Sequence, residues 1–225
     1  MIPWILLDSA RVPGRGGELG LYQCGDELTI RIIGEVGLMN SHQHDSEDAL
    51  AELTCRRLQD TIDPRILIGG LGMGFTLSSA LRNIGELARV EVAELVSAVV
   101  KWNRGVIGEH SGHPLKDPRV CVREVDVADI IRAERRAFDA IILDVDNGPD
   151  GLTRKSNDWL YSLDGLVESY EALRPGGLLS VWSAGPEEKF TSRLLKVGFS
   201  VEQMHVRVRN AKGTTDVIWF ARREE

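Results

Sequence analysis

The sequence predicts an α/β protein with a seven-stranded, mostly parallel sheet that ends in an antiparallel hairpin, preceded by a small β-rich segment. Three observations lead to this prediction. An apolar run at 66–68 passes through four closely spaced glycines into a helical pattern. Strand and helix patterns then alternate up to residue 197, which is typical of parallel sheets covered by helices. The last two strand-like runs are separated by a loop too short for a crossover helix.

The composition suits a protein with one main domain. A chain of 225 residues with 43% hydrophobic and 27% charged residues can form one α/β domain with a small appendage. We expect residues 1–60 to form a β-rich segment with one helix, and residues 61–225 to form the α/β domain. The net charge of −7 argues against nucleic acid as a partner, because phosphate backbones attract basic surfaces.

The location is predicted from what the sequence lacks. Its three cysteines have no CxxC spacing, and its start shows neither a basic region nor a long apolar core. No apolar run is long enough to form a membrane-spanning helix. These features predict a cytoplasmic protein that does not bind membranes.

The first 60 residues contain three short strand patterns and one helix pattern. Glycine or acidic turn residues separate the strands, and the alternation at 28–32 is typical of a half-exposed antiparallel strand. Ser46 is expected to cap the helix, because Glu47 and Asp48 would then lie in its first turn and complement its dipole. The strands are expected at 4–7, 20–24 and 28–33, and the helix runs to about residue 60.

The α/β part follows from the alternation of patterns. Strands are expected at 66–68, 89–94, 117–126, 138–144 and 178–182, and helices at 75–84, 96–104, 127–135, 160–173 and 187–197. The runs 199–208 and 215–221 must pair as antiparallel neighbours. A mostly parallel sheet with such a terminal hairpin is typical of the class I S-adenosylmethionine-dependent methyltransferase fold, a Rossmann-like architecture, rather than of an ordinary dinucleotide-binding domain.

The ligand site is predicted at the carboxyl ends of the parallel strands, where open α/β sheets bind their ligands. Gly70, Gly72 and Gly74 follow the first of these strands and allow the backbone to approach a ligand closely. The next three strands each end in a carboxylate. These carboxylates are Glu94, Asp126 and Asp144.

Two of these carboxylates suit an adenosine group. Glu94 stands where an acidic residue accepts hydrogen bonds from ribose hydroxyls. Asp126 can accept one from an adenine amino group, or alternatively cap the helix that follows it. The glycine turn alone leaves NAD open as the ligand, whereas the second acidic strand end and the hairpin favour an adenosyl sulfonium.

The segment 144–150 follows the fourth parallel strand and contains three carboxylates. Such a site attracts an amine, and Asp144 is the candidate base, helped by Asp146. The alternative is a turn that Asp, Asn, Gly and Pro favour for conformational reasons. Tyr161 and Trp182 are candidates for the pocket wall, with a role in the core as their alternative. The polar cluster 42–45 is interpreted as a loop, and no metal site is predicted.

The ordered motifs resemble those of the spermidine and spermine synthases, the aminopropyltransferases. The resemblance rests on segments 66–77, 90–102, 117–126, 138–149 and 173–181. It implies a donor, decarboxylated S-adenosylmethionine, that is held by the glycine turn and Glu94, with Asp126 at the adenine. It also implies that Asp144 assists deprotonation of the acceptor amine.

The sequence departs from the family pattern near the acceptor. The second Asp of the family's Asp-x-x-Asp-Pro loop is replaced by Asn147, and its Tyr-His pair by Leu50 and Ala51, while Glu47 is kept as a substrate-binding candidate. The resemblance predicts aminopropyl transfer to a polyamine-type amine. The exposed terminal hairpin and the amino-terminal strands are expected to pair across a homodimer interface. Methyl transfer from S-adenosylmethionine to a small molecule and a non-catalytic nucleoside-binding protein are the alternatives.

Overall fold

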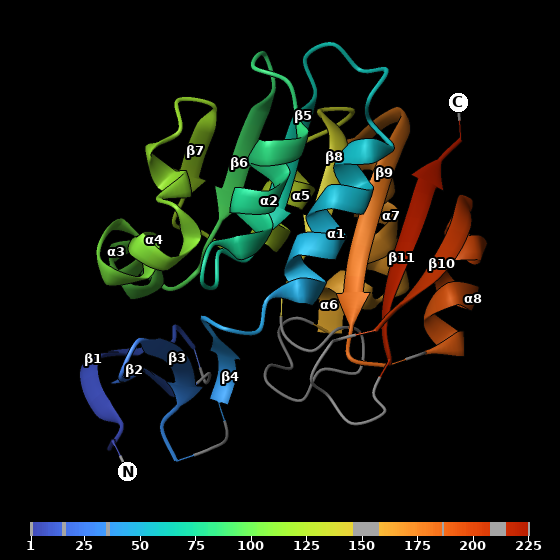
Figure 1. Ribbon diagram of the computed structural model, residues 1–225. Helices are drawn as coiled ribbons and strands as arrows, with labels where there is room; N and C mark the ends of the chain where they lie inside the picture. The colour runs from blue at the N-terminus through green and yellow to red at the C-terminus, as the bar shows by residue number, and fades with distance from the viewer. Residues whose placement is uncertain are drawn as a thin grey trace.

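The computed structural model describes residues 2–14, 17–34, 37–145, 158–185, 187–207 and 215–224. These residues form two sheets (Figure 1). The smaller is antiparallel, with four strands in chain order: β1 (Ile5–Arg11), β2 (Glu18–Cys24), β3 (Glu27–Ile32) and β4 (Gly37–Asn40).

The larger sheet has seven strands in the order β10-β11-β9-β8-β5-β6-β7. Its strands are β5 (Arg65–Gly69), β6 (Arg89–Ala93), β7 (Val120–Arg123), β8 (Phe138–Leu143), β9 (Leu173–Ser183), β10 (Phe199–Arg207) and β11 (Thr215–Arg223). The strands β5 to β9 are parallel, and the hairpin β10–β11 joins β9 in antiparallel orientation. The predicted fold class is therefore confirmed.

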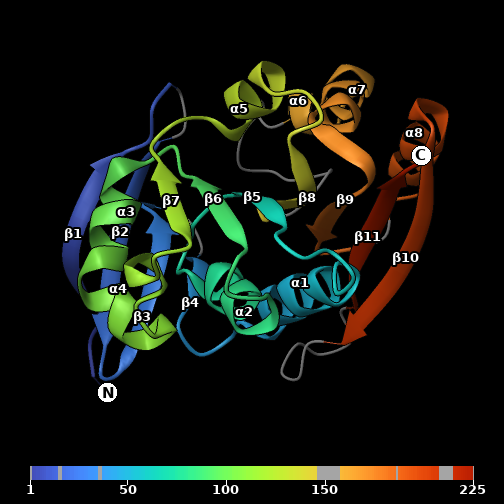
Figure 2. The same cartoon turned by 90° about the horizontal axis from the view of Figure 1, so that it is seen from above.

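Helices cover both faces of this sheet (Figure 2). The helices are α1 (Asp45–Arg56), α2 (Phe75–Asn83), α3 (Ser97–Arg104), α4 (Val106–Ser111), α5 (Val127–Ala133), α6 (Asp158–Tyr161), α7 (Leu163–Ala172) and α8 (Glu188–Val197), with a 3-10 turn at Pro114–Lys116. One apolar cluster joins α1 and α2 to one face, and a second joins α5, α7 and α8 to the other. Because both faces are covered, the parallel strands are apolar without alternation. No helix in the described part of the chain is both long and apolar enough to span a membrane.

The structure corrects several predicted elements. Strand β4 and helix α4 were not predicted, and β7 ends at Arg123 rather than at Asp126. The single helix expected at 160–173 is two helices, because Ser162 caps α7 by accepting a hydrogen bond from the Gly165 N–H at 3.2 Å. Helix α1 begins at Asp45 with His44 at its N-cap position, whereas the hydroxyl of Ser46 donates to the Glu47 carboxylate at 2.6 Å.

The small sheet packs at the carboxyl edge of the large one (Figure 1). The Asp8 carboxylate on β1 accepts hydrogen bonds from the indole N–H of Trp102 at 2.9 Å and from Lys101 at 3.0 Å, both on α3. At the other end of the small sheet, Met39 on β4 lies against Gly72. The segment 41–44, which connects β4 to α1, therefore borders the predicted ligand site.

Candidate active site

The parallel strands β5, β6 and β8 end in register with one another. Gly69 on β5 pairs with Ala93 on β6 and with Leu143 on β8. The Asp144 N–H donates to the Gly69 carbonyl at 3.1 Å, and the Gly70 N–H donates to the Ala93 carbonyl at 2.9 Å. The glycine loop, Glu94 and Asp144 consequently start from the same edge of the sheet.

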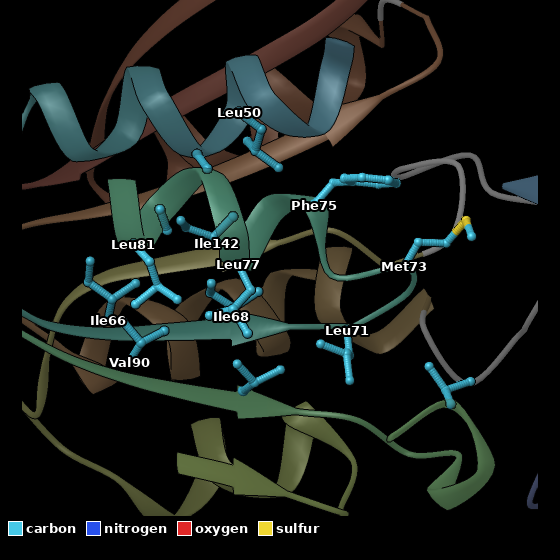
Figure 3. Packing of buried hydrophobic residues seen from close by; sticks show 14 of the residues in the cluster. Leu50, Ile66, Ile68, Leu71, Met73, Phe75, Leu77, Leu81, Val90 and Ile142 are labelled. Atoms are coloured by element: carbon cyan, nitrogen blue, oxygen red, sulfur yellow. The ribbon is translucent and has the colours of Figure 1, made fainter. Parts of the chain in front are cut away.

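In the glycine loop, residues 70–75, glycines alternate with large apolar residues. Leu71, Met73 and Phe75 are buried, and Figure 3 shows these side chains beyond the end of β5. The intervening glycines all have positive φ, 88° at Gly70, 51° at Gly72 and 81° at Gly74. Apolar burial on one side thus fixes a backbone conformation that only glycine adopts readily.

Asn103 on α3 stabilises the backbone of the glycine loop. The residue is only 1% exposed, and its side-chain amide donates hydrogen bonds to the carbonyls of Gly72 at 2.8 Å and Val99 at 3.0 Å. A Cβ at Gly74 would lie 2.7 Å from the Asn103 side-chain oxygen, which is closer than side-chain atoms can approach. Glycine is therefore required at 74 by both its conformation and its neighbour.

Glu94 is bound to the backbone of the same loop. Its carboxylate accepts from the Leu71 N–H at 3.0 Å and from the Val96 N–H at 2.8 Å. The residue is 9% exposed, and this burial raises the pKa of its carboxyl group, while the backbone N–H donors oppose the rise. Carboxylate oxygens have further lone pairs, so Glu94 can brace the loop and still accept from ribose hydroxyls.

Asp126 caps helix α5. Its carboxylate accepts a hydrogen bond from the Ala128 N–H at 2.9 Å, which is the alternative that the sequence left open beside an adenine contact. The two roles are compatible because the second carboxylate oxygen makes no hydrogen bond within the described residues.

We expect Asp126→Ala to lower the free energy of unfolding by about 1 kcal/mol through loss of the cap. Asp126→Asn keeps an accepting oxygen at the cap and should stay close to the wild type. Urea unfolding measures this difference. Equal losses in the two variants would show that charge, rather than the cap, stabilises the helix.

Asp144 is held by a residue of the first helix turn after the glycines. The hydroxyl of Thr76 donates a short hydrogen bond to the Asp144 carboxylate. Burial raises the pKa of Asp144, and the hydrogen bond from Thr76 opposes that rise. Burial raises the pKa of Glu47, in the first turn of α1, to about 7, and the charge of nearby Asp144 adds to this rise. Glu47 therefore tends to retain a proton beside the carboxyl group of Asp144.

This pair makes stability depend on pH. The folded pKa of Glu47, about 7, lies above its ordinary value of 4.5, so the native state binds more protons between these values. The resulting stabilisation is fully present below pH 4.5 and is lost as the pH rises through about 7. Glu47→Gln should reduce this loss, whereas Glu52→Gln, which removes an exposed partner of Arg56 on the same helix, should not. Urea midpoints measured from pH 5 to pH 8 test this, and parallel curves for wild type and Glu47→Gln would contradict it.

The remaining predicted site residues are dispersed. Tyr161 packs with the second apolar cluster and donates its hydroxyl to the Val145 carbonyl at 3.0 Å, so it supports the backbone next to Asp144. Trp182 packs with the first cluster, on the opposite face of the sheet. The structure does not bring these two aromatic residues together as one wall. Asp146 lies outside the described residues.

Three residues that border this site were not proposed from the sequence. Thr76 fixes Asp144, Met39 covers Gly72, and the His44 ring stacks on Phe75 with their centroids 4.0 Å apart. For His44 a signal was present, because an acidic residue, Asp48, follows it at the helical i,i+4 spacing. The contacts of Thr76 and Met39 depend on how distant strands are placed, which the sequence pattern does not give.

Comparison with known proteins identifies the fold. Neither a protein-family model nor a curated protein matches the sequence. Among solved structures, a spermidine synthase in complex with the transition-state analogue AdoDATO has a TM-score of 0.75 at 17% identity, covering 97% of this chain and 72% of that one. Spermidine synthase from Thermotoga maritima has the same TM-score and coverage at 16% identity.

Two further structures widen the comparison. A probable spermidine synthase from Corynebacterium glutamicum has a TM-score of 0.64 at 16% identity, covering 97% of this chain and 80% of that one. The CurJ carbon methyltransferase has a TM-score of 0.54 at 14% identity, with 76% and 51% coverage. The chain therefore has a spermidine synthase-like form of the class I S-adenosylmethionine-dependent methyltransferase fold.

Proposed function

We propose that this protein transfers an aminopropyl group from decarboxylated S-adenosylmethionine to an amine. The observation that carries this proposal is the carboxyl group of Glu47 close to that of Asp144, beside the glycine loop. Burial raises the pKa of both carboxyl groups, and the charge of Asp144 adds to this rise at Glu47. A site with this charge attracts cationic amines and repels the carboxylate of intact S-adenosylmethionine, which favours the decarboxylated donor.

Different residues would bind the aminopropyl donor and the acceptor amine. The positive-φ backbone at Gly70, Gly72 and Gly74 would contact the donor, Glu94 its ribose and Asp126 its adenine. Asp144 would orient the acceptor amine and accept its proton. The amine lone pair then attacks the propyl carbon bonded to sulfur, the C–S bond breaks, and its electron pair stays on the sulfur.

Calorimetry with the two donors tests the proposal directly. We expect tighter binding of decarboxylated S-adenosylmethionine, and release of methylthioadenosine when diamines or polyamines are added. Tighter binding of S-adenosylmethionine, with methylation of a small molecule, would instead support methyl transfer, which a carbon methyltransferase of similar fold makes the second candidate. Binding of donor without turnover of any amine would support a nucleoside-binding protein.

A further inference from the structure

Asp216, at the start of β11, carries a buried carboxyl group near the edge of the sheet where the site lies. The residue is 6% exposed, and burial raises the pKa of its carboxyl group. The indole N–H of Trp182 on β9 opposes this rise, yet that N–H is itself buried without a hydrogen-bond partner. Asp216 forms no ion pair with any described residue. Because a buried acid without a cation is costly, this arrangement suits a ligand that supplies a positive charge.

Strand pairing places Asp216 on the same face of the sheet as Asp144. The register of β8 and β9 makes Asp144 level with Trp182, and Trp182 pairs directly with Ile218 on β11. Side chains two residues apart on a strand share a face, so Asp216 lies on the face of Ile218, one step nearer the carboxyl edge. The Asp144 carboxylate is on this face too, because Thr76 of α2, which packs there, donates to it.

Helix α1 brings Glu47 to this face. The helix packs on β8, β9 and β11, and the hydroxyl of Thr54 donates to that of Ser180 on β9 at 2.8 Å. Glu47 precedes Thr54 by seven residues, so the two side chains lie on one side of the helix, about 10 Å apart along its axis. Figure 1 shows that α1 begins at the edge where β9 ends. Glu47 therefore faces the end of β9, the strand that separates Asp144 from Asp216.

The distance between the two aspartates suits an extended ligand. Strand β9 lies between β8 and β11, and two strand spacings with an offset of two residues separate the backbones of Asp144 and Asp216 by about 12 Å. Carboxylates at the two ends of such a span can each accept charge-assisted hydrogen bonds from an ammonium group. The ring of Trp182, between them on the same face, offers apolar surface to a methylene chain.

We propose that Asp216 binds the second, non-reacting ammonium group of the acceptor and thereby selects α,ω-diamines over monoamines. The reacting amine would lie at Asp144, and the methylene chain would cross Trp182. Asp216 lies outside the segments that carry the resemblance to the aminopropyltransferases. It meets no reacting atom, so it determines specificity rather than the rate of the chemical step. This inference rests on the proposed aminopropyl transfer.

Acceptors of equal chain length with one or two amino groups test this role. In at least one of the pairs diaminobutane with butylamine and diaminohexane with hexylamine, wild type should prefer the diamine by about 10- to 10²-fold in kcat/KM, the range for one charged hydrogen bond. Asp216→Asn should raise the diamine KM by that factor and leave kcat, monoamine kinetics and donor affinity close to wild type. Glu202→Gln removes a charge from the same hairpin, where it pairs with Arg57, and should keep the diamine preference as the matched control.

The outcomes separate this inference from the proposed function. Equal kcat/KM for diamine and monoamine in the wild-type protein would overturn the role of Asp216 while the proposed transfer stands, and this measurement needs no variant. A folded, donor-binding Asp216→Asn variant that keeps the wild-type diamine KM, or that is slowed equally with both amines, would overturn it as well. A wild-type protein that alkylates no amine would overturn the proposed function and, with it, this inference.

Discussion

Asp144→Asn is expected to slow aminopropyl transfer by about 10²- to 10⁴-fold while leaving donor binding close to wild type. Asparagine keeps the shape of the side chain and an oxygen that can accept from Thr76, so the local packing should survive. It removes the negative charge that attracts the amine and the base that accepts its proton. The loss should therefore appear in kcat and in amine KM, and calorimetry with the decarboxylated donor should separate it from donor affinity.

The control lies on the same strand. Asp139 on β8 accepts from the Arg65 N–H at 2.8 Å and from Arg174 at 2.8 Å, at the opposite end of the sheet from the site. Asp139→Asn should cost stability but retain turnover at temperatures where both variants are folded. A rate for Asp144→Asn within a few-fold of this control would refute the role of Asp144.

Substitutions of Thr76 test the role of the Asp144 carboxylate in a second way. Its hydrogen bond favours the ionised form of Asp144 and so lowers the pKa of that group. In Thr76→Val, the rising limb of the pH–rate profile should therefore move to higher pH, while Thr76→Ser, which keeps the hydroxyl, should restore it. This pair of variants tests the hydrogen bond without removing the carboxylate itself.

The fold could be predicted because its signals are local. Uninterrupted apolar runs mark strands covered on both faces, and the few residues of sequence between the last two strand patterns leave antiparallel pairing as the only choice. The residues that end β6 and β8 could be found in the same way, since parallel strands bring their carboxyl ends to one edge. Glu94 and Asp144 were predicted at one edge by this argument, and their starting points in the structure agree with it.

The features that sequence reasoning missed depend on distant contacts. Strand β4 has only four residues and is held by pairing with β3, where the Thr29 hydroxyl also donates to the Met39 carbonyl at 2.8 Å. Ser46 had the right residue type for a helix cap, but its hydroxyl donates to Glu47, and the N-cap position is two residues earlier, at His44. Local propensity suggests such roles, and the surrounding structure decides which residue takes them.

Gly70→Ala is expected to disrupt both folding and the site. Its φ of 88° is strained for any residue with a Cβ, which costs about 1 to 2 kcal/mol. The added Cβ would also lie 2.5 Å from the Asp144 carbonyl oxygen and 3.2 Å from a methyl group of Val145. Because that oxygen belongs to the backbone at the end of β8, it cannot rotate away, and relieving the overlap adds about 1 to 3 kcal/mol.

Gly176→Ala is the control that distinguishes backbone strain at positive φ from the steric overlap expected in Gly70→Ala. Gly176 has a similar φ of 76°, yet a Cβ there would meet no atom within 4 Å. Urea unfolding should therefore show a clearly larger loss of stability for Gly70→Ala than for Gly176→Ala. The collision also displaces the backbone that carries the Asp144 carboxylate, and misplacement by about 1 Å can cost about 10² in rate, so Gly70→Ala should lose turnover even where it remains folded. Equal stability and normal turnover in both variants would mean that the strand ends can separate, and the close approach of the glycine loop to β8 would then not hold the site together.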